Sequence, residues 1–150
     1  MSAQDDIARL VKEASASLKG DLGGALAKLQ SAFELARQAG VAEDSAMVAE
    51  ELARALTRRK APARSLHYAA KATKLAPERK AAWTTLAKTC ELLATRTQGE
   101  HKQGRARVLY RGAGAAFERA AKLTRDPEDK RWLLELAGDA KKQAAPPKAP

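Results

Sequence analysis

Apolar residues recur along the chain at helical spacing, and one arrangement of them occurs more than once. Between residues 49 and 56 they occupy positions i, i+3, i+4 and i+7, and the same order returns 34 residues later. The pairs that share this offset are Ala49 and Trp83, Leu52 and Leu86, Ala53 and Ala87, and Leu56 and Cys90. Because a fixed period of about 20 to 50 residues is typical of helical arrays, this pattern predicts stacked helical hairpins.

A second spacing marks the other helix of each hairpin. It places small or apolar residues at i, i+4, i+7 and i+10, and it occurs three times. The copies are Ala25-Leu29-Ala32-Leu35, Ser65-Ala69-Ala72-Leu75 and Ala113-Phe117-Ala120-Leu123. The first spacing also returns at residues 7–14 and 133–140. The chain is therefore predicted to be all-α, with three antiparallel hairpins and a C-terminal capping helix, seven helices in total.

Turn and capping residues set the expected ends of these helices. Gly23 and Gly24 are expected to break the chain before the second helix, and Gly40 is expected to end it. Pro62 suits the first turn of a helix, as does Pro127 after Asp126. By length, residues 1–142 are predicted to form one helical domain. The Pro- and Ala-rich residues 143–150 are predicted to be a disordered tail.

The distance between the repeats changes in the second half of the chain. Phe117 follows Ala69 by 48 residues rather than 34, so about 14 extra residues precede the sixth helix. They fall within residues 95–111, which are rich in Arg and Lys. The pattern leaves open whether this segment is a loop or lengthens the two neighbouring helices.

Composition supports closely packed helices in a reducing compartment. Hydrophobic residues make up 45% of the chain but aromatic residues only 4%, so the apolar content is mostly Ala and Leu. Ala favours helices and lets them approach closely. The apolar runs are too short to span a bilayer, the chain begins with an acidic segment, and the single Cys90 has no partner for an internal disulfide. A cytoplasmic location is expected.

The net charge of +10 is unevenly distributed. Residues 1–56 hold six Lys or Arg and nine Asp or Glu, a balance of 6 − 9 = −3. Residues 57–150 hold 22 and nine, a balance of 22 − 9 = +13. Such asymmetry indicates an acidic partner, which could be an acidic protein segment, nucleic acid or an anionic membrane.

The basic residues concentrate around two expected hairpin turns. Because the inside turns of stacked hairpins share an edge, both groups are predicted to form one basic ridge. The ridge residues are Arg58, Arg59, Lys60, Arg64, Arg96, Lys102, Arg105, Arg107 and Arg111. A solvated surface that keeps the protein soluble explains the same charges, and the sequence leaves both interpretations open.

No catalytic or metal-binding pattern is found in the sequence. His67 and His101 are far apart and have no ligand spacing around them, while Cys90 holds a core position of the repeat. Trp83 is predicted to be a core residue. Trp132 is predicted to be a partly buried lid on the last helix, and the alternative is an exposed Trp132 that anchors a partner or stacks on a base. We therefore expect no enzymatic activity, metal, cofactor or small-molecule substrate.

The repeated residues resemble the tetratricopeptide-repeat family over about residues 4–141. The closest pieces are Trp83 and Leu86 followed by Ala87, and Ala113 and Phe117 followed by Ala120. The departures are that Ala87 replaces the family's Gly, Cys90 its Tyr and Ala69 its aromatic residue. The resemblance implies a right-handed stack of about three such hairpin repeats.

The resemblance also implies a function carried by a surface. In such arrays the first helices line a concave groove that holds peptides or helices. The corresponding residues of this chain are Glu50, Arg54, Thr57, Thr84, Lys88 and Glu91. The chain has no Asn, so a full carboxylate clamp of the kind found in some family members is absent.

The expected function is that of an adaptor or scaffold, which binds another protein through the groove or the ridge. The alternative is sequence-independent binding of nucleic acid through the ridge. Attachment to a membrane is less favoured, because only Val108, Leu109 and Tyr110 supply bulky apolar groups beside the charge.

Overall fold

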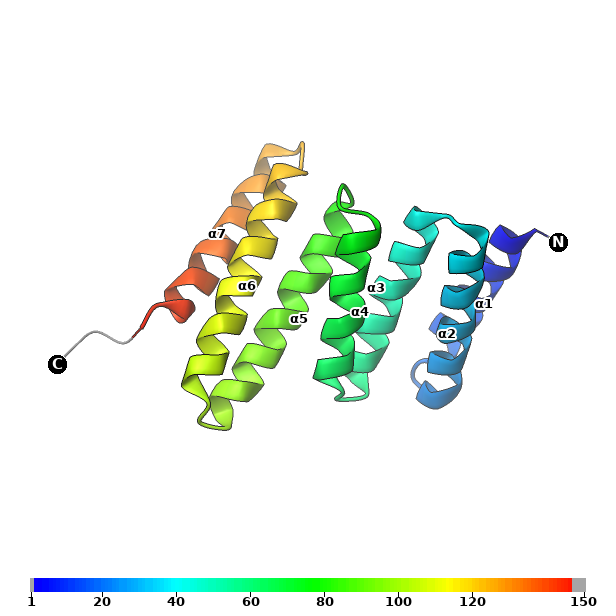
Figure 1. The fold of residues 1–150 in the computed structure, drawn as a ribbon, viewed down its shortest axis with the longest axis horizontal. Coiled ribbons are helices and arrows are strands. Elements are labelled where there is room, and N and C mark those ends of the chain that lie inside the picture. The colour runs from blue at the N-terminus through cyan, green and yellow to red at the C-terminus, as the bar shows by residue number, and fades with distance from the viewer. Residues whose placement is uncertain (1, 147–150) are drawn as a thin grey trace. The chain divides into compact units, whose positions relative to one another are not determined.

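The computed structural model describes residues 2–146, and these contain seven α-helices and no strand (Figure 1). The all-α prediction is therefore confirmed. The helices are α1 (Ala3–Ser17), α2 (Leu22–Ala39), α3 (Ala42–Arg58), α4 (Pro62–Leu75), α5 (Lys80–Gly99), α6 (Gln103–Lys122) and α7 (Pro127–Ala144).

The helices belong to two compact units, where chain length predicts one domain. The first unit ends at Pro77 and holds α1 to α4, in which each helix packs against the next. The second unit begins at Glu78 and holds α5 to α7, in which α6 packs against both α5 and α7 (Figure 1).

In the first unit, α3 and α4 approach closely where the repeat pattern places a small residue. Ser65 is fully buried and donates a hydrogen bond of 2.7 Å from its Oγ to the carbonyl oxygen of Ala53. The Thr57 hydroxyl lies 2.8 Å from the Ser65 hydroxyl and 2.9 Å from the same carbonyl. The small polar side chain therefore satisfies its own hydrogen bonds while it lets the two helices meet.

The core of the second unit is built around Phe117 of α6. Phe117 is 1% exposed and lies in a cluster with Leu133 of α7 and five alanines of the three helices. The half-buried Trp83 and Leu86 pack against this cluster from α5. The helical spacing therefore predicted the buried residues Phe117 and Leu133 correctly, whereas Trp83 and Leu86 cover the cluster and are only half-buried.

The extra residues between the repeats lengthen two helices and do not form a loop. Both α5 and α6 have 20 residues, whereas α3 has 17 and α4 has 14, and only residues 100–102 separate α5 from α6. The extension has a core of its own, in which Tyr110 packs with Ala94, Ala106 and Ala144. The Tyr110 hydroxyl lies 3.0 Å from Oγ1 of Thr95.

Two expected helix boundaries are wrong. Gly23 and Gly24 lie inside α2, because Asp21 caps the helix by accepting the N–H of Gly24 at 2.9 Å. Gln143 and Ala144, expected in the tail, are the last residues of α7, and Ala144 is buried against the extension. Residues 147–150 of the predicted tail lie outside the described residues.

Three turns end their helices with the same pair of hydrogen bonds. After α5, the N–H of His101 donates to the carbonyl of Gln98 at 3.0 Å, and the N–H of Lys102 donates to that of Thr97 at 3.1 Å. This pattern is the Schellman motif, which places its C′ residue in the left-handed region. That residue is Gly40 after α2, Lys60 after α3 and His101 after α5, with φ of 72°, 60° and 63°.

Replacement of His101 by glycine is expected to stabilise the second unit by about 0.5–1 kcal/mol. A left-handed φ strains a residue that carries a Cβ by about 1–2 kcal/mol, and the greater freedom of glycine in the unfolded chain offsets part of the gain. Thermal melting of His101→Gly measures the effect. Gly40→Ala is the reverse control and should lower the melting temperature, and equal effects of both changes would contradict this explanation.

Candidate partner-binding face

The predicted groove residues of the first unit are largely occupied by internal contacts. Glu50 is only 1% exposed, so the expectation that it faces a groove is wrong. Thr57 is half-buried and its hydroxyl is bonded within the α3–α4 interface. Arg54 is exposed but forms an ion pair with Glu51 of its own helix. Glu50 and Thr57 therefore belong to the packed part of this unit, whereas Arg54 stays exposed and its assignment to the groove stays a prediction.

In the second unit, the predicted groove residues lie on the side of α5 that is near α7. Lys80, one turn before Thr84, forms an ion pair of 3.7 Å with Asp129 of α7. Thr84 is half-buried and bonds the Lys80 carbonyl through its hydroxyl at 3.1 Å. Lys88 is exposed and Glu91 is half-buried. Because these residues are spaced by three or four positions, they form one stripe along α5.

A matching stripe runs along α7. Asp129, Trp132, Leu136 and Asp139 are separated by three or four residues and share one side of the helix. Asp129 contacts α5 through its ion pair with Lys80, and Leu136 packs on the core of the unit. Trp132 is 60% exposed, so its expected role as a partly buried lid is wrong.

We define the α5–α7 face as the surface that these two stripes form. Its members are Lys80, Thr84, Lys88, Glu91, Asp129, Trp132 and Asp139. Sequence spacing assigned three of them to a groove, but it missed Asp129 and Asp139, because only their interactions with α5 show which side of α7 they occupy. The face combines a large exposed aromatic group with charges of both signs.

The two tryptophans of the unit have different environments. Trp83 packs against the Phe117 cluster, and the guanidinium carbon of Arg119 lies 5.9 Å from the centre of its ring. Arg119 also pairs with Glu78 at 3.8 Å. Trp83 is therefore held within the unit on several sides, whereas the exposed Trp132 offers an aromatic surface to a partner.

The carboxyl group of Glu91 lies in an environment that disfavours its ionised form. Partial burial raises the pKa of its carboxyl group, and the negative charge of Asp139 raises that pKa further, while Lys88 opposes both. Loss of hydration and a nearby like charge both destabilise an ionised carboxylate. The ionised form is therefore less favourable in the folded state than in the unfolded state. A hydrogen-bond donor or a positive charge beside Glu91 and Asp139 would therefore stabilise the ionised form of Glu91.

Replacement of Glu91 by glutamine is expected to raise the melting temperature near neutral pH. The folded pKa of Glu91 is raised, so its ionisation destabilises the fold above that pKa and not below the unfolded pKa of about 4.3. The difference between Glu91→Gln and wild type should therefore disappear at about pH 3.5. Melting curves across this range test it, with the exposed Glu135→Gln on α7 as the matched control. A difference that persists unchanged in acid would contradict the electrostatic origin.

The predicted basic ridge falls on both compact units. In the first unit, Arg58, Arg59, Lys60 and Arg64 surround the turn between α3 and α4, and all four are exposed. In the second unit, the remaining ridge residues surround the turn between α5 and α6. That the two groups form one continuous ridge stays a prediction.

The basic residues of the second unit are partly neutralised at the turn between α5 and α6. Glu100 pairs with Arg96 and with Lys102, each at 3.6 Å. Within the part of the chain that the structure describes, no carboxylate lies within ion-pair distance of Arg105, Arg107 or Arg111, although Arg107 is half-buried. The positive charge available to a partner is therefore greatest along α6, beyond the turn.

Two lysines of α7, which the sequence did not assign to the ridge, lie near this basic group. The C-terminal end of α7 packs beside the extension, where Ala144 contacts the cluster around Tyr110. This contact brings Lys141 and Lys142 to the same end of the unit, although Lys141 pairs with Glu118 of α6. The 3.6-residue pattern contained no signal for this arrangement, because it depends on which helices are neighbours.

The apolar residues beside the basic group are mostly internal. Tyr110 is 7% exposed and Leu109 is half-buried in the same cluster, whereas Val108 is 61% exposed. Tyr110 is thus unavailable for stacking on a base, and the bulky apolar groups considered for membrane attachment reduce to Val108. The membrane alternative therefore loses two of its three apolar groups, whereas sequence-independent binding of phosphates through the basic ridge does not require Tyr110.

Cys90 is a packed thiol, as its repeat position predicts. It is 7% exposed, and burial, reinforced by the charge of Glu91, raises its pKa to about 11. At neutral pH it is therefore almost entirely the unreactive thiol. His67 and His101 are both exposed. Among the described residues, no three His, Cys, Asp or Glu side chains come together in a way that could hold a metal ion.

No protein-family model matches the chain, and no curated protein matches it either. None of the helices within residues 2–146 combines the length and apolar character needed to cross a membrane.

Proposed function

We propose that the protein is an adaptor or scaffold with a helical-repeat architecture of the tetratricopeptide type. The repeated spacings support it, as do the antiparallel packing of neighbouring helices within each unit and the small residues where helices meet. On this proposal, the chain binds another protein through the α5–α7 face, which corresponds to the groove side of such arrays.

The observation that carries the proposal is the exposure of Trp132. A tryptophan that is 60% exposed leaves a large apolar surface in water, and such residues are frequent energetic centres of protein interfaces. Lys88 and Glu91 on α5 and Asp139 on α7 provide a polar rim on the same side. The combination of an aromatic anchor with a charged rim is typical of protein–protein contacts.

A photo-crosslinking amino acid with an aromatic side chain, which keeps an aromatic group at position 132, tests the proposal directly. The full chain with this substitution is irradiated in a cell lysate, and crosslinked products are identified by mass spectrometry with and without nuclease treatment. We expect a defined protein adduct that resists nuclease. The matched control carries the same amino acid at position 134, because Leu134 is 48% exposed but is not part of the α5–α7 face.

Competition then assigns the contact to the tryptophan. Addition of excess wild-type protein, which lacks the crosslinking amino acid, should suppress the adduct. Addition of excess Trp132→Ala protein should not. An adduct that forms equally at positions 132 and 134 would show that the exposed apolar groups collide with proteins at random. A signal abolished by nuclease would point to nucleic acid and would contradict the adaptor proposal.

A further inference from the structure

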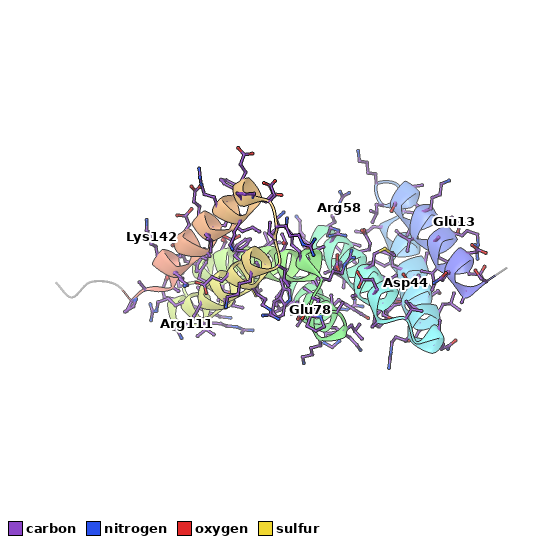
Figure 2. All side chains as sticks on the ribbon, turned by 90° about the horizontal axis from the view of Figure 1, so that it is seen from above. Glu13, Asp44, Arg58, Glu78, Arg111 and Lys142 are labelled. Atoms are coloured by element: carbon purple, nitrogen blue, oxygen red, sulfur yellow. The ribbon has the colours of Figure 1, made fainter. Side chains whose placement is uncertain are left out.

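The fully exposed charged residues of α6 are all positive. The core side includes Ala106, Tyr110, Ala113, Phe117 and Ala120, and the opposite side is exposed. We define the back face of α6 by its exposed residues Arg105, Val108, Arg111, Gly112, Ala115 and Lys122. Figure 2 labels Arg111 on α6 at the outer surface of the second unit.

The charges of the back face are not neutralised within the molecule. Over residues 2–146, Arg105, Arg111 and Lys122 have no ion pair. The single carboxylate of α6, Glu118, pairs with Lys141 of α7. Arginines that have no ion pair and lie on one side of a helix can pair with several carboxylates of an acidic partner at once.

The surface between these charges is apolar and carries only small side chains. Val108 lies one turn from both Arg105 and Arg111 and is 61% exposed, while Gly112 and Ala115 project little or no side chain. Small residues in the contact allow two helix axes to approach closely, and the exposed valine gives an apolar contact between the charges. The back face therefore has the profile of one side of a helix–helix interface.

Charge spacing distinguishes an acidic helix from nucleic acid. From Arg105 to Lys122 the helix rises by about 25 Å, and Arg119, which is already paired with Glu78, is the one further cation on this side of the helix. A nucleic-acid strand presents a phosphate every ~3.4 Å of axis, or about seven over this length, and gains nothing from an exposed valine. A protein helix with carboxylates one turn apart on either side of an apolar residue matches the arrangement better.

We propose that the back face of α6 is a docking site for an acidic amphipathic helix of another protein. Carboxylates of that helix pair with Arg105 and Arg111, and an apolar side chain between them covers Val108. The site is separate from the α5–α7 face, so one chain can hold two protein segments at once. This property goes beyond the binding of a single partner.

Binding of a synthetic peptide tests the site. The probe is an acetylated, amidated peptide that repeats EELAAEA three times, which sets leucines between glutamates on one side of a helix. Titration into the full chain at about 50 mM salt, followed by calorimetry and by circular dichroism, is expected to show saturable binding with a gain of helix. Arg105→Glu with Arg111→Glu should weaken the affinity at least about tenfold.

The matched control reverses the same charge elsewhere on the unit. Lys130→Glu with Arg131→Glu changes two exposed basic residues of α7 and should alter the affinity by less than about threefold. Val108→Ser should weaken the peptide several-fold, and a peptide of the same composition with leucine and glutamate on opposite sides should bind more weakly. Trp132→Ala should leave peptide binding unchanged, which separates this site from the α5–α7 face.

Three results would overturn the proposal. One is a wild-type protein that does not bind the peptide at concentrations up to about 1 mM. A second is an equal loss of affinity in both charge-reversal variants, or equal binding of both peptides, since either shows attraction by net charge alone. The third is a DNA duplex of similar length that binds more tightly than the peptide and depends on the same arginines, which would make the back face a nucleic-acid surface.

Discussion

Phe117→Ala is expected to lower the free energy of unfolding of the second unit by about 3–5 kcal/mol. Phe117 is the largest fully buried side chain among the described residues and fills the space between α5, α6 and α7. Its neighbours are mainly alanines, which have no side-chain freedom to fill the space left behind. The loss therefore combines the transfer free energy of the ring with the penalty of a cavity that cannot collapse.

Tryptophan fluorescence during urea unfolding measures this effect selectively. Trp83 and Trp132, the two tryptophans of the chain, both belong to the second unit, so their fluorescence reports on its unfolding. The control is Val108→Ala on the same helix, which removes an exposed apolar group and should change stability by no more than about 0.5 kcal/mol. A Phe117→Ala midpoint close to that of wild type would show that the cluster is not the core of this unit.

Gly114→Val is expected to lower the stability of the same unit by about 1–3 kcal/mol. A Cβ added at Gly114 would lie 3.1 Å from Cγ of Lys141 and 3.4 Å from the carbonyl oxygen of Ala137. The Lys141 side chain can move, but the carbonyl belongs to the backbone of α7. The two further methyl groups of valine would therefore push α6 and α7 apart in a tightly packed contact.

Gly112 provides the matched control for this substitution. It lies on the same helix, but a Cβ there would meet only the Sγ of Cys90, at 3.8 Å, which is an ordinary contact. Gly112→Val should stay within about 0.5 kcal/mol of wild type, since valine is at least as favourable as glycine in a helix. Equal melting temperatures of the two valine variants would contradict a close approach of α6 and α7 at Gly114.

The sequence by itself determined the helices and much of the core. Apolar spacing fixes the angle at which each side chain leaves its own helix, so it predicts that Phe117, Leu52 and Ser65 are buried, and all three are. The same spacing correctly predicted that Cys90 is a packed residue. The offset of 48 residues also located the extra segment, although it could not distinguish a loop from longer helices.

The tertiary structure decided which sides of each helix are covered by another helix. Glu50 has the spacing of a surface residue yet is buried, and Trp132 adjoins a buried position yet is exposed. Lys141 and Lys142 join the basic end of the second unit only because α7 packs beside the extension. Periodicity describes one helix at a time, whereas burial and charge clustering depend on neighbours that are distant in sequence, so only the packed structure reveals the faces available to a partner.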